Sequence, residues 1–256
     1  MRQLAQQSGH TREKLYRIIN HWLKKEPAST NGSLEQYRYL IFDGTFLHRP
    51  TSIVTVMDAS RNQVIVGKYG ISENSERQLF KFFKPLVAKG LNPVSCTVAG
   101  NPQAIKVIRQ LWPGIIIQRC LVHIQRQGLM WCRRYPKTAS ARRLRDIFLR
   151  VTHVRNKEER DEFLELISQW EQEYGQYIKI QPEKGRVFSD IKRARSMLMK
   201  ALPDMFHYLG NPDISISTNG LESYFSRLKS HYRQHRGLRK KKLDNYFSWY
   251  LFYKPK

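Results

Sequence analysis

The spacing of hydrophobic and polar residues changes along the chain and divides it into distinct parts. In residues 1–26, apolar positions recur every three or four residues, which predicts a short helix, a turn at Gly9 and a second, amphipathic helix. Residues 27–36 are rich in small and turn-forming residues and are typical of a linker. We therefore expect an N-terminal helical arm that a linker joins to a larger body.

Residues 37–123 combine short apolar runs with one-sided helical stripes. In chain order they predict strands at 39–43, 52–57 and 63–69, a helix at 75–89, a strand at 94–98, a helix beginning at Pro102 and a strand at 115–117. Asn101 is expected to cap the helix that Pro102 opens. This order indicates an α/β (α+β) fold, with a mixed sheet and flanking helices.

The signals for strands fade in the second half of the chain. Residues 124–212 predict an all-helical insertion, in which apolar residues between Phe163 and Trp170 share one face. Residues 213–256 predict a last helix of the core, followed by a basic and aromatic segment. The aromatic residues at 246–253 present more apolar surface than a free tail should, so we expect them to pack on the core or on another subunit.

Composition points to a polyanionic partner. The 256 residues include 45 Lys and Arg against 21 Asp and Glu, a formal charge of +24 at pH 7. Such a charge is costly unless a polyanion shares the surface, so nucleic acid is the first candidate. No apolar run approaches the roughly 18–20 residues of a membrane span, so a membrane partner is not expected. Three cysteines are too few for a disulfide framework, which favours a reducing compartment.

The basic residues gather in blocks that are typical of phosphate-contacting faces. Between Glu76 and Asp146 there are 14 Lys or Arg and no acid. A generally basic soluble surface is the alternative, and the arm is either the DNA-reading part of a helix-turn-helix or a plain amphipathic arm. The candidate DNA-binding residues are Arg12, Lys14 and Arg17 in the arm, Arg126, Arg133 and Arg134 in the insertion, and Lys229, Arg233, Arg236, Arg239, Lys240, Lys241 and Lys242 near the C-terminus.

Two acids lie where metal-dependent chemistry would need them. Asp43 is expected at the end of the first strand, beside Gly44, and Glu222 in the first turn of the last helix of the core. Carboxylates placed in this way hold the Mg²⁺ ions of two-metal phosphoryl transfer, for which Mn²⁺ substitutes. Each acid has a structural alternative: Asp43 as a turn residue, and Glu222 as the partner of Asn219 in a capping box. Asp58 is expected to be a turn residue.

Three motifs carry a resemblance to a known family: IFDGTF around Asp43, GNPQAI followed by WPGIIIQRCLVH, and STNGLESYFSRLK around Glu222. On these motifs the segment 37–229 resembles the DDE transposases of the bacterial insertion-sequence and Mutator-like superfamily. The resemblance implies an RNase H-like fold with Asp43 and Glu222 as the first and third metal ligands. It also implies a prokaryotic, cytoplasmic and nucleoid-associated enzyme. Its partners would be double-stranded DNA, both terminal inverted repeats and target, and further copies of itself in a homodimer or larger assembly.

The second acid of the DDE pattern is missing. The pattern places it at the end of the fourth strand, just before GNPQAI, where this chain has Ala99. Without that carboxylate, metal binding should be weak and catalysis should largely fail. Either the chain was disabled deliberately, which the intact flanks of Asp43 and Glu222 favour, or it is a naturally degenerate copy. The alternatives to a transposase are a transposase-derived DNA-binding protein without catalysis and an RNase H-like nuclease.

The resemblance includes a Cys-x-x-His motif, here Cys120 and His123. Two ligands are half of a zinc site, a second pair with ligand spacing is missing, and Cys132 is too uncertainly placed to complete it. We therefore favour packing and hydrogen bonding near the active site, with His123 close to a phosphate. Trp112 is expected in the core. Trp131, among basic residues, either stacks on an unpaired base or packs in the core.

Overall fold

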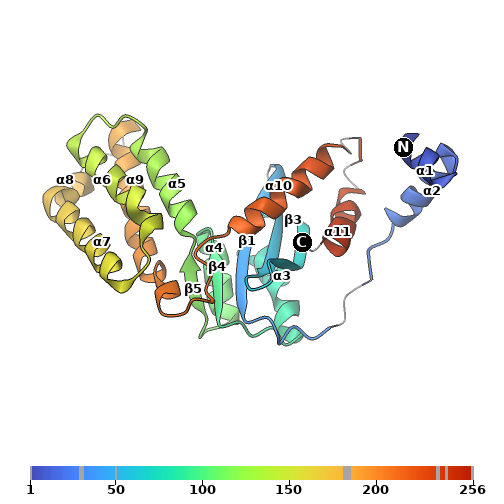
Figure 1. Cartoon of the computed structure of the whole chain (residues 1–256), viewed down its shortest axis with the longest axis horizontal. Helices are drawn as coiled ribbons and strands as arrows, with labels where there is room; N and C mark the ends of the chain where they lie inside the picture. Colours follow the sequence, from blue (N-terminus) through green and yellow to red (C-terminus); the bar gives the residue numbers. More distant parts are fainter. Residues whose placement is uncertain are drawn as a thin grey trace.

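A five-stranded mixed sheet lies at the centre of the protein (Figure 1). The computed structural model describes residues 2–28, 32–49, 51–180, 186–234, 237–239 and 242–254. The strands, in the spatial order β3-β2-β1-β4-β5, are β1 (Tyr39–His48), β2 (Thr51–Asp58), β3 (Gln63–Ile71), β4 (Ser95–Val98) and β5 (Ile116–Arg119). β2 pairs antiparallel with β1 and β3, whereas β4 pairs parallel with β1 and β5. The predicted α/β (α+β) fold, with three strands followed by alternating helices and strands, is confirmed.

β1 is longer than the sequence predicts. We expected it to end at Asp43, and this was wrong, because β2 pairs with it as far as His48. β4 has only four residues, and its last pair with β1 is Phe42–Val98. Asp43 therefore lies where the parallel half of the sheet stops and the antiparallel half continues.

One face of the sheet is covered by α3 (Glu76–Ala88) and α4 (Pro102–Leu111). The cap of α4 is the predicted one, since the Asn101 side chain accepts a hydrogen bond from the Ala104 N–H at 3.1 Å. Buried residues of the two helices, among them Phe83 and Ile108, pack on the apolar side chains of the strands. This burial fixes α4 directly after the short strand β4.

The opposite face is covered by α10 (Asn219–Arg233) and α11 (Leu243–Tyr253). Leu221, Tyr224 and Phe247 are fully buried in a cluster that includes Ile41 and Ile53 of the sheet. The aromatic C-terminal segment thus packs on the core, which is one of the two outcomes that its composition predicted.

Between β5 and α10 the chain forms a helical bundle with a core of its own (Figure 1). Its helices are α5 (Leu121–Cys132), α6 (Ala139–Arg150), α7 (Lys157–Trp170), α8 (Gln176–Ile180) and α9 (Arg186–Ala201). Phe163 and Trp170 are buried in this core, as the apolar face predicts. Of the helices that the structure describes, none is long and apolar enough to span a membrane.

The N-terminal arm consists of α1 (Arg2–Ser8) and α2 (Arg12–Trp22), and it lies against α11 (Figure 1). The two predicted helices and the turn at Gly9, whose φ is +65°, are confirmed. Trp249 of α11 donates from Nε1 to the carbonyl oxygens of Trp22 at 3.1 Å and Lys25 at 2.9 Å. The rings of Trp22 and Trp249 also meet edge to face, with 5.5 Å between their centroids. The arm is therefore docked on the C-terminal helix.

Candidate active site

Asp43 of β1 lies next to the end of β4, and Ala99 directly follows that end. The last pair of β1 and β4 is Phe42–Val98, so Asp43 and Ala99 are the next residues along the two segments. Asp43 is only 8% exposed, and its Oδ1 accepts a hydrogen bond from the Gly44 N–H at 2.8 Å. Ala99 is half-buried and presents a methyl group. The position that the DDE pattern gives to the second acid is thus beside the first acid.

Glu222 reaches the same region from the first turn of α10. The predicted capping box is wrong, because Thr218 is the cap residue and Asn219 is already helical. The Glu222 carboxylate contacts α5 instead of the start of its own helix. Leu221 is fully buried in the cluster below, and its packing holds the first turn of α10 over β1.

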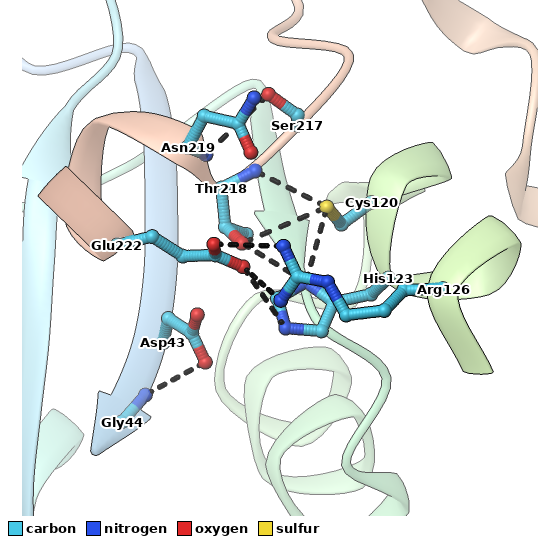
Figure 2. A network of polar contacts seen from close by, with 9 residues as sticks. All are labelled: Asp43, Gly44, Cys120, His123, Arg126, Ser217, Thr218, Asn219 and Glu222. Atoms are coloured by element: carbon cyan, nitrogen blue, oxygen red, sulfur yellow. Dashed lines mark hydrogen bonds and ion pairs between the residues drawn. The ribbon is translucent and has the colours of Figure 1, made fainter. Parts of the chain in front are cut away.

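The start of α5 meets the start of α10 in a network of polar contacts (Figure 2). His123 Nδ1 lies 3.2 Å from both the Cys120 Sγ and the Thr218 Oγ1. His123 Nε2 lies 3.4 Å from the Glu222 Oε1. The Thr218 N–H also donates to the Cys120 Sγ at 3.3 Å. These contacts fix the imidazole between the sulfur on one side and the carboxylate on the other.

Arg126, six residues after Cys120 on α5, pairs with both oxygens of Glu222 (Figure 2). Its Nη1 donates to Oε1 and its Nη2 to Oε2, each at 3.0 Å. The hydrogen bonds from Arg126 to Glu222 raise the pKa of the guanidinium. Asp43, His123, Arg126, Glu222 and Lys229 together line one cavity of about 360 Å³. The cavity therefore holds two acids and at least two permanent cations.

Burial raises the pKa of Asp43 to about 6. Attraction to His123 and the hydrogen bond from Gly44 oppose this rise, whereas repulsion from Glu73 adds to it. Asp43 is therefore an acid that the fold holds in a poorly solvated position.

Glu73 is an acid that our sequence analysis missed. It follows β3, and its carboxylate lies so close to Gly44 that a side chain at position 44 would collide with it. Burial raises the pKa of Glu73, and its Oε1 is buried without a hydrogen-bond partner. The glycine inside β1 was a usable signal, since a glycine within a strand often marks a close approach by another group.

The other predicted DNA-binding residues lie on separate surfaces. Exposed ones are Arg12, Lys14 and Arg17 on α2, Arg133 and Arg134 after α5, and Arg233 and Arg239 around the end of α10. Arg133 pairs with Asp190 at 3.3 Å, and Lys242 donates to the Asn20 Oδ1 at 2.6 Å. Arg236, Lys240 and Lys241 lie outside the described residues. DNA binding by these side chains stays a prediction.

The zinc interpretation of Cys120 and His123 gains nothing from the geometry. Cys132 is buried at the far end of α5, roughly 18 Å along the helix at 1.5 Å per residue. In the part of the chain that the structure describes, no group of three or more His, Cys, Asp or Glu side chains is placed to hold a metal ion. Trp112 is buried, as predicted, and Trp131 is half-buried against the core of the helical bundle. Asp58 accepts a hydrogen bond from the Ser60 N–H at 3.4 Å, as a turn residue does.

The sequence of the sheet and most of the bundle identifies the family. Residues 32–195, more than half of the chain, match the family model for transposases of the Mutator family. The chain belongs to this family. The segment of this Mutator-family transposase that matches includes Asp43, Ala99, Cys120 and His123, whereas Glu222 lies beyond it. Glu222 is therefore assigned to the candidate site from the packing of α10 and not from the family match. A comparison with curated proteins gives no match.

The chain is a transposase by family, and the substrate of a transposase is DNA. The fold places two acids, Asp43 and Glu222, and the basic side chains of Arg126 and Lys229 around one cavity. This cavity is therefore the candidate active site of the transposase.

Proposed function

We propose that this transposase cleaves and joins DNA at a DDE site made of Asp43, residue 99 and Glu222, and that Ala99 disables the copy described. The observation that supports the proposal is the register of β1 and β4, whose last pair, Phe42–Val98, comes directly before Asp43 and Ala99, beneath the α10 helix that carries Glu222. The mixed sheet, its helices on both faces and the helical bundle before α10 support an RNase H-like core.

The donor set suits a hard cation. Asp43 and Glu222 offer carboxylate oxygens to one cavity, and one or two carboxylates are enough to bind one hydrated Mg²⁺ or Mn²⁺. Ala99 adds no donor, so the residues present fit one ion and lack a ligand for a two-ion site. When bound, such an ion supplies Lewis-acid stabilisation of the charge on the reacting phosphate oxygens.

The protein's own side chains orient the DNA in this proposal. Arg126 and Lys229 give the cavity a positive rim for the phosphodiester, and His123 lies at its wall. Cys120 and Thr218 hold the His123 ring in place, so its orientation does not depend on the substrate. The exposed basic residues of α2 and of the end of α10 are the proposed contacts to the terminal inverted repeats and target DNA. Two element ends must meet, which calls for a homodimer or larger assembly.

Restoring the acid tests the proposal. We would compare the chain with Ala99→Asp and Ala99→Asn in a strand-transfer assay on pre-cleaved element ends in Mg²⁺. We expect strand transfer to rise by at least about 100-fold with aspartate, the size of effect that one charge-stabilising group has in an enzyme. Asparagine has the same shape without the charge and should leave the chain inactive. If the Ala99→Asp protein binds the ends and joins none of them, the proposal is wrong.

A second candidate function is DNA binding without catalysis by a descendant of a transposase. The specific observation in its favour is Ala99, since a methyl group stands where the pattern has a ligand. This candidate predicts salt-dependent DNA binding by both the parent chain and the Ala99→Asp variant, and no joining by either. An RNase H-like nuclease would instead cleave branched DNA after restoration and join none.

A further inference from the structure

Arg126 occupies the carboxylate that the proposed site needs as a ligand. Its two terminal nitrogens each donate to one oxygen of Glu222, at 3.0 Å and 3.0 Å (Figure 2). A guanidinium fork takes one of the two lone-pair sites on each carboxylate oxygen, and its positive charge repels a cation that approaches the same carboxylate. The ion pair with Arg126 therefore competes with a cation for Glu222.

The two helices do not need this ion pair to stay together. The Leu121 N–H donates to the Ile216 carbonyl at 3.1 Å, and the Thr218 N–H donates to the Cys120 Sγ at 3.3 Å. Both contacts are between backbone or buried groups at the junction of α5 and α10. Arg126, by contrast, has a side chain that is 60% exposed. These contacts already join α5 to the start of α10, so the Arg126–Glu222 pair is not needed for that purpose.

We propose that Arg126 is a positioning residue that exchanges partners, pairing with Glu222 when no cation is bound and moving to a DNA phosphate when Glu222 binds a cation. The inference rests on the proposed function, because it takes Glu222 as a ligand. A cation on Glu222 would repel the guanidinium, and a phosphate in the same cavity would attract it. Lys229, which also lines the cavity, keeps the rim positive while Arg126 moves.

Cation affinity tests the exchange directly. We would titrate Mn²⁺ into the Ala99→Asp protein and into its Arg126→Gln and Arg126→Lys forms by calorimetry, with Asp43→Asn to identify the site signal. Arg126→Gln should tighten Mn²⁺ binding by about two- to fivefold, because an exposed ion pair no longer competes for Glu222. Arg126→Lys keeps the positive charge but lacks the two-pronged guanidinium. Its Mn²⁺ affinity should lie between that of the Ala99→Asp protein and that of its Arg126→Gln form.

Arg143→Gln is the matched control. Arg143 is also 60% exposed and paired with a glutamate, Glu173, but it lies on α6 and does not line the cavity. Its replacement should leave Mn²⁺ affinity unchanged. Unchanged or weaker Mn²⁺ binding by Arg126→Gln, with Arg126→Lys showing the same, would overturn the exchange.

DNA binding supplies the second readout. If Arg126 reaches a phosphate, Arg126→Gln should lower the slope of log K against log salt by about one, whereas Arg126→Lys should keep it. A slope that both variants leave unchanged would also overturn the exchange. The proposed function fails separately: tighter Mn²⁺ binding by Arg126→Gln without any strand transfer by Ala99→Asp would refute catalysis alone. Restored strand transfer with unchanged Mn²⁺ binding would refute the exchange alone.

Discussion

Replacing Asp43 by asparagine should stabilise the folded chain at neutral pH. Burial raises the pKa of Asp43 from its ordinary value of 3.8 to about 6, so its ionised form is disfavoured in the fold. Asparagine has the same shape and keeps the oxygen that accepts from the Gly44 N–H, but it never ionises. The variant therefore removes the cost of a buried charge and preserves the local hydrogen bond.

The size of the effect follows from the two pKa values of Asp43. The folded chain binds the proton more tightly than the unfolded chain, so stability falls as pH rises from 3.8 through about 6. At 1.36 kcal/mol for each pH unit between these values, the ionised carboxylate costs about 3 kcal/mol above pH 6. Asp43 is only 8% exposed, so solvent screens little of this cost.

Urea denaturation between pH 5 and pH 8, in a chelating buffer, measures how much Asp43→Asn raises the free energy of unfolding. We expect Asp43→Asn to be more stable than the parent by about 3 kcal/mol at pH 8, and by about half of that near pH 5. Asp58→Asn is the control, since Asp58 is also buried but accepts a hydrogen bond from its own turn. A difference that does not change with pH, or a loss of stability at pH 8, would refute the assignment of the cost to a buried charge.

Two further predictions concern close contacts. Gly44→Ala should destabilise the chain by about 1–3 kcal/mol, because the new methyl group collides with Glu73; urea titration measures the loss, and adding Glu73→Ala should recover part of it. Trp249→Phe keeps an aromatic ring but loses the bonds to the Trp22 and Lys25 carbonyls, so limited proteolysis should cut the arm faster than in the parent. Equal cutting rates would mean that ring packing alone holds the arm.

The strands and their order could be predicted because each is a local signal. The apolar runs that form β1, β2 and β3 and the Asn101-Pro102 start of α4 are contained in a few consecutive residues. The parallel pairing of β1 with β4, which brings Asp43 near Ala99, is known from the structure and not from these local signals. The extension of β1 to His48 did not follow, because β2 rather than its own pattern determines it.

Contacts between distant segments could not be predicted in this way. Arg126 and Glu222 are 96 residues apart, and Trp22 and Trp249 are 227 apart. Their meeting depends on how the helical bundle and α11 pack on the sheet, which no local spacing contains. The capping box failed for a related reason. The helix begins one residue earlier than the capping box requires, and Glu222 pairs with Arg126 of the distant helix α5.

The burial that makes ionised Asp43 unfavourable would also make a second carboxylate at position 99 unfavourable. A carboxylate at this position would lie beside Asp43 on the neighbouring strand, and two like charges in one poorly solvated place repel each other. The form of the site with three acids is therefore less stable than the chain as it stands, unless a cation neutralises it. The groups that hold the other two acids, Gly44 for Asp43 and Arg126 for Glu222, make no use of residue 99. An alanine at position 99 thus avoids this repulsion, and in the proposed function it also removes a metal ligand while the other two acids stay in place.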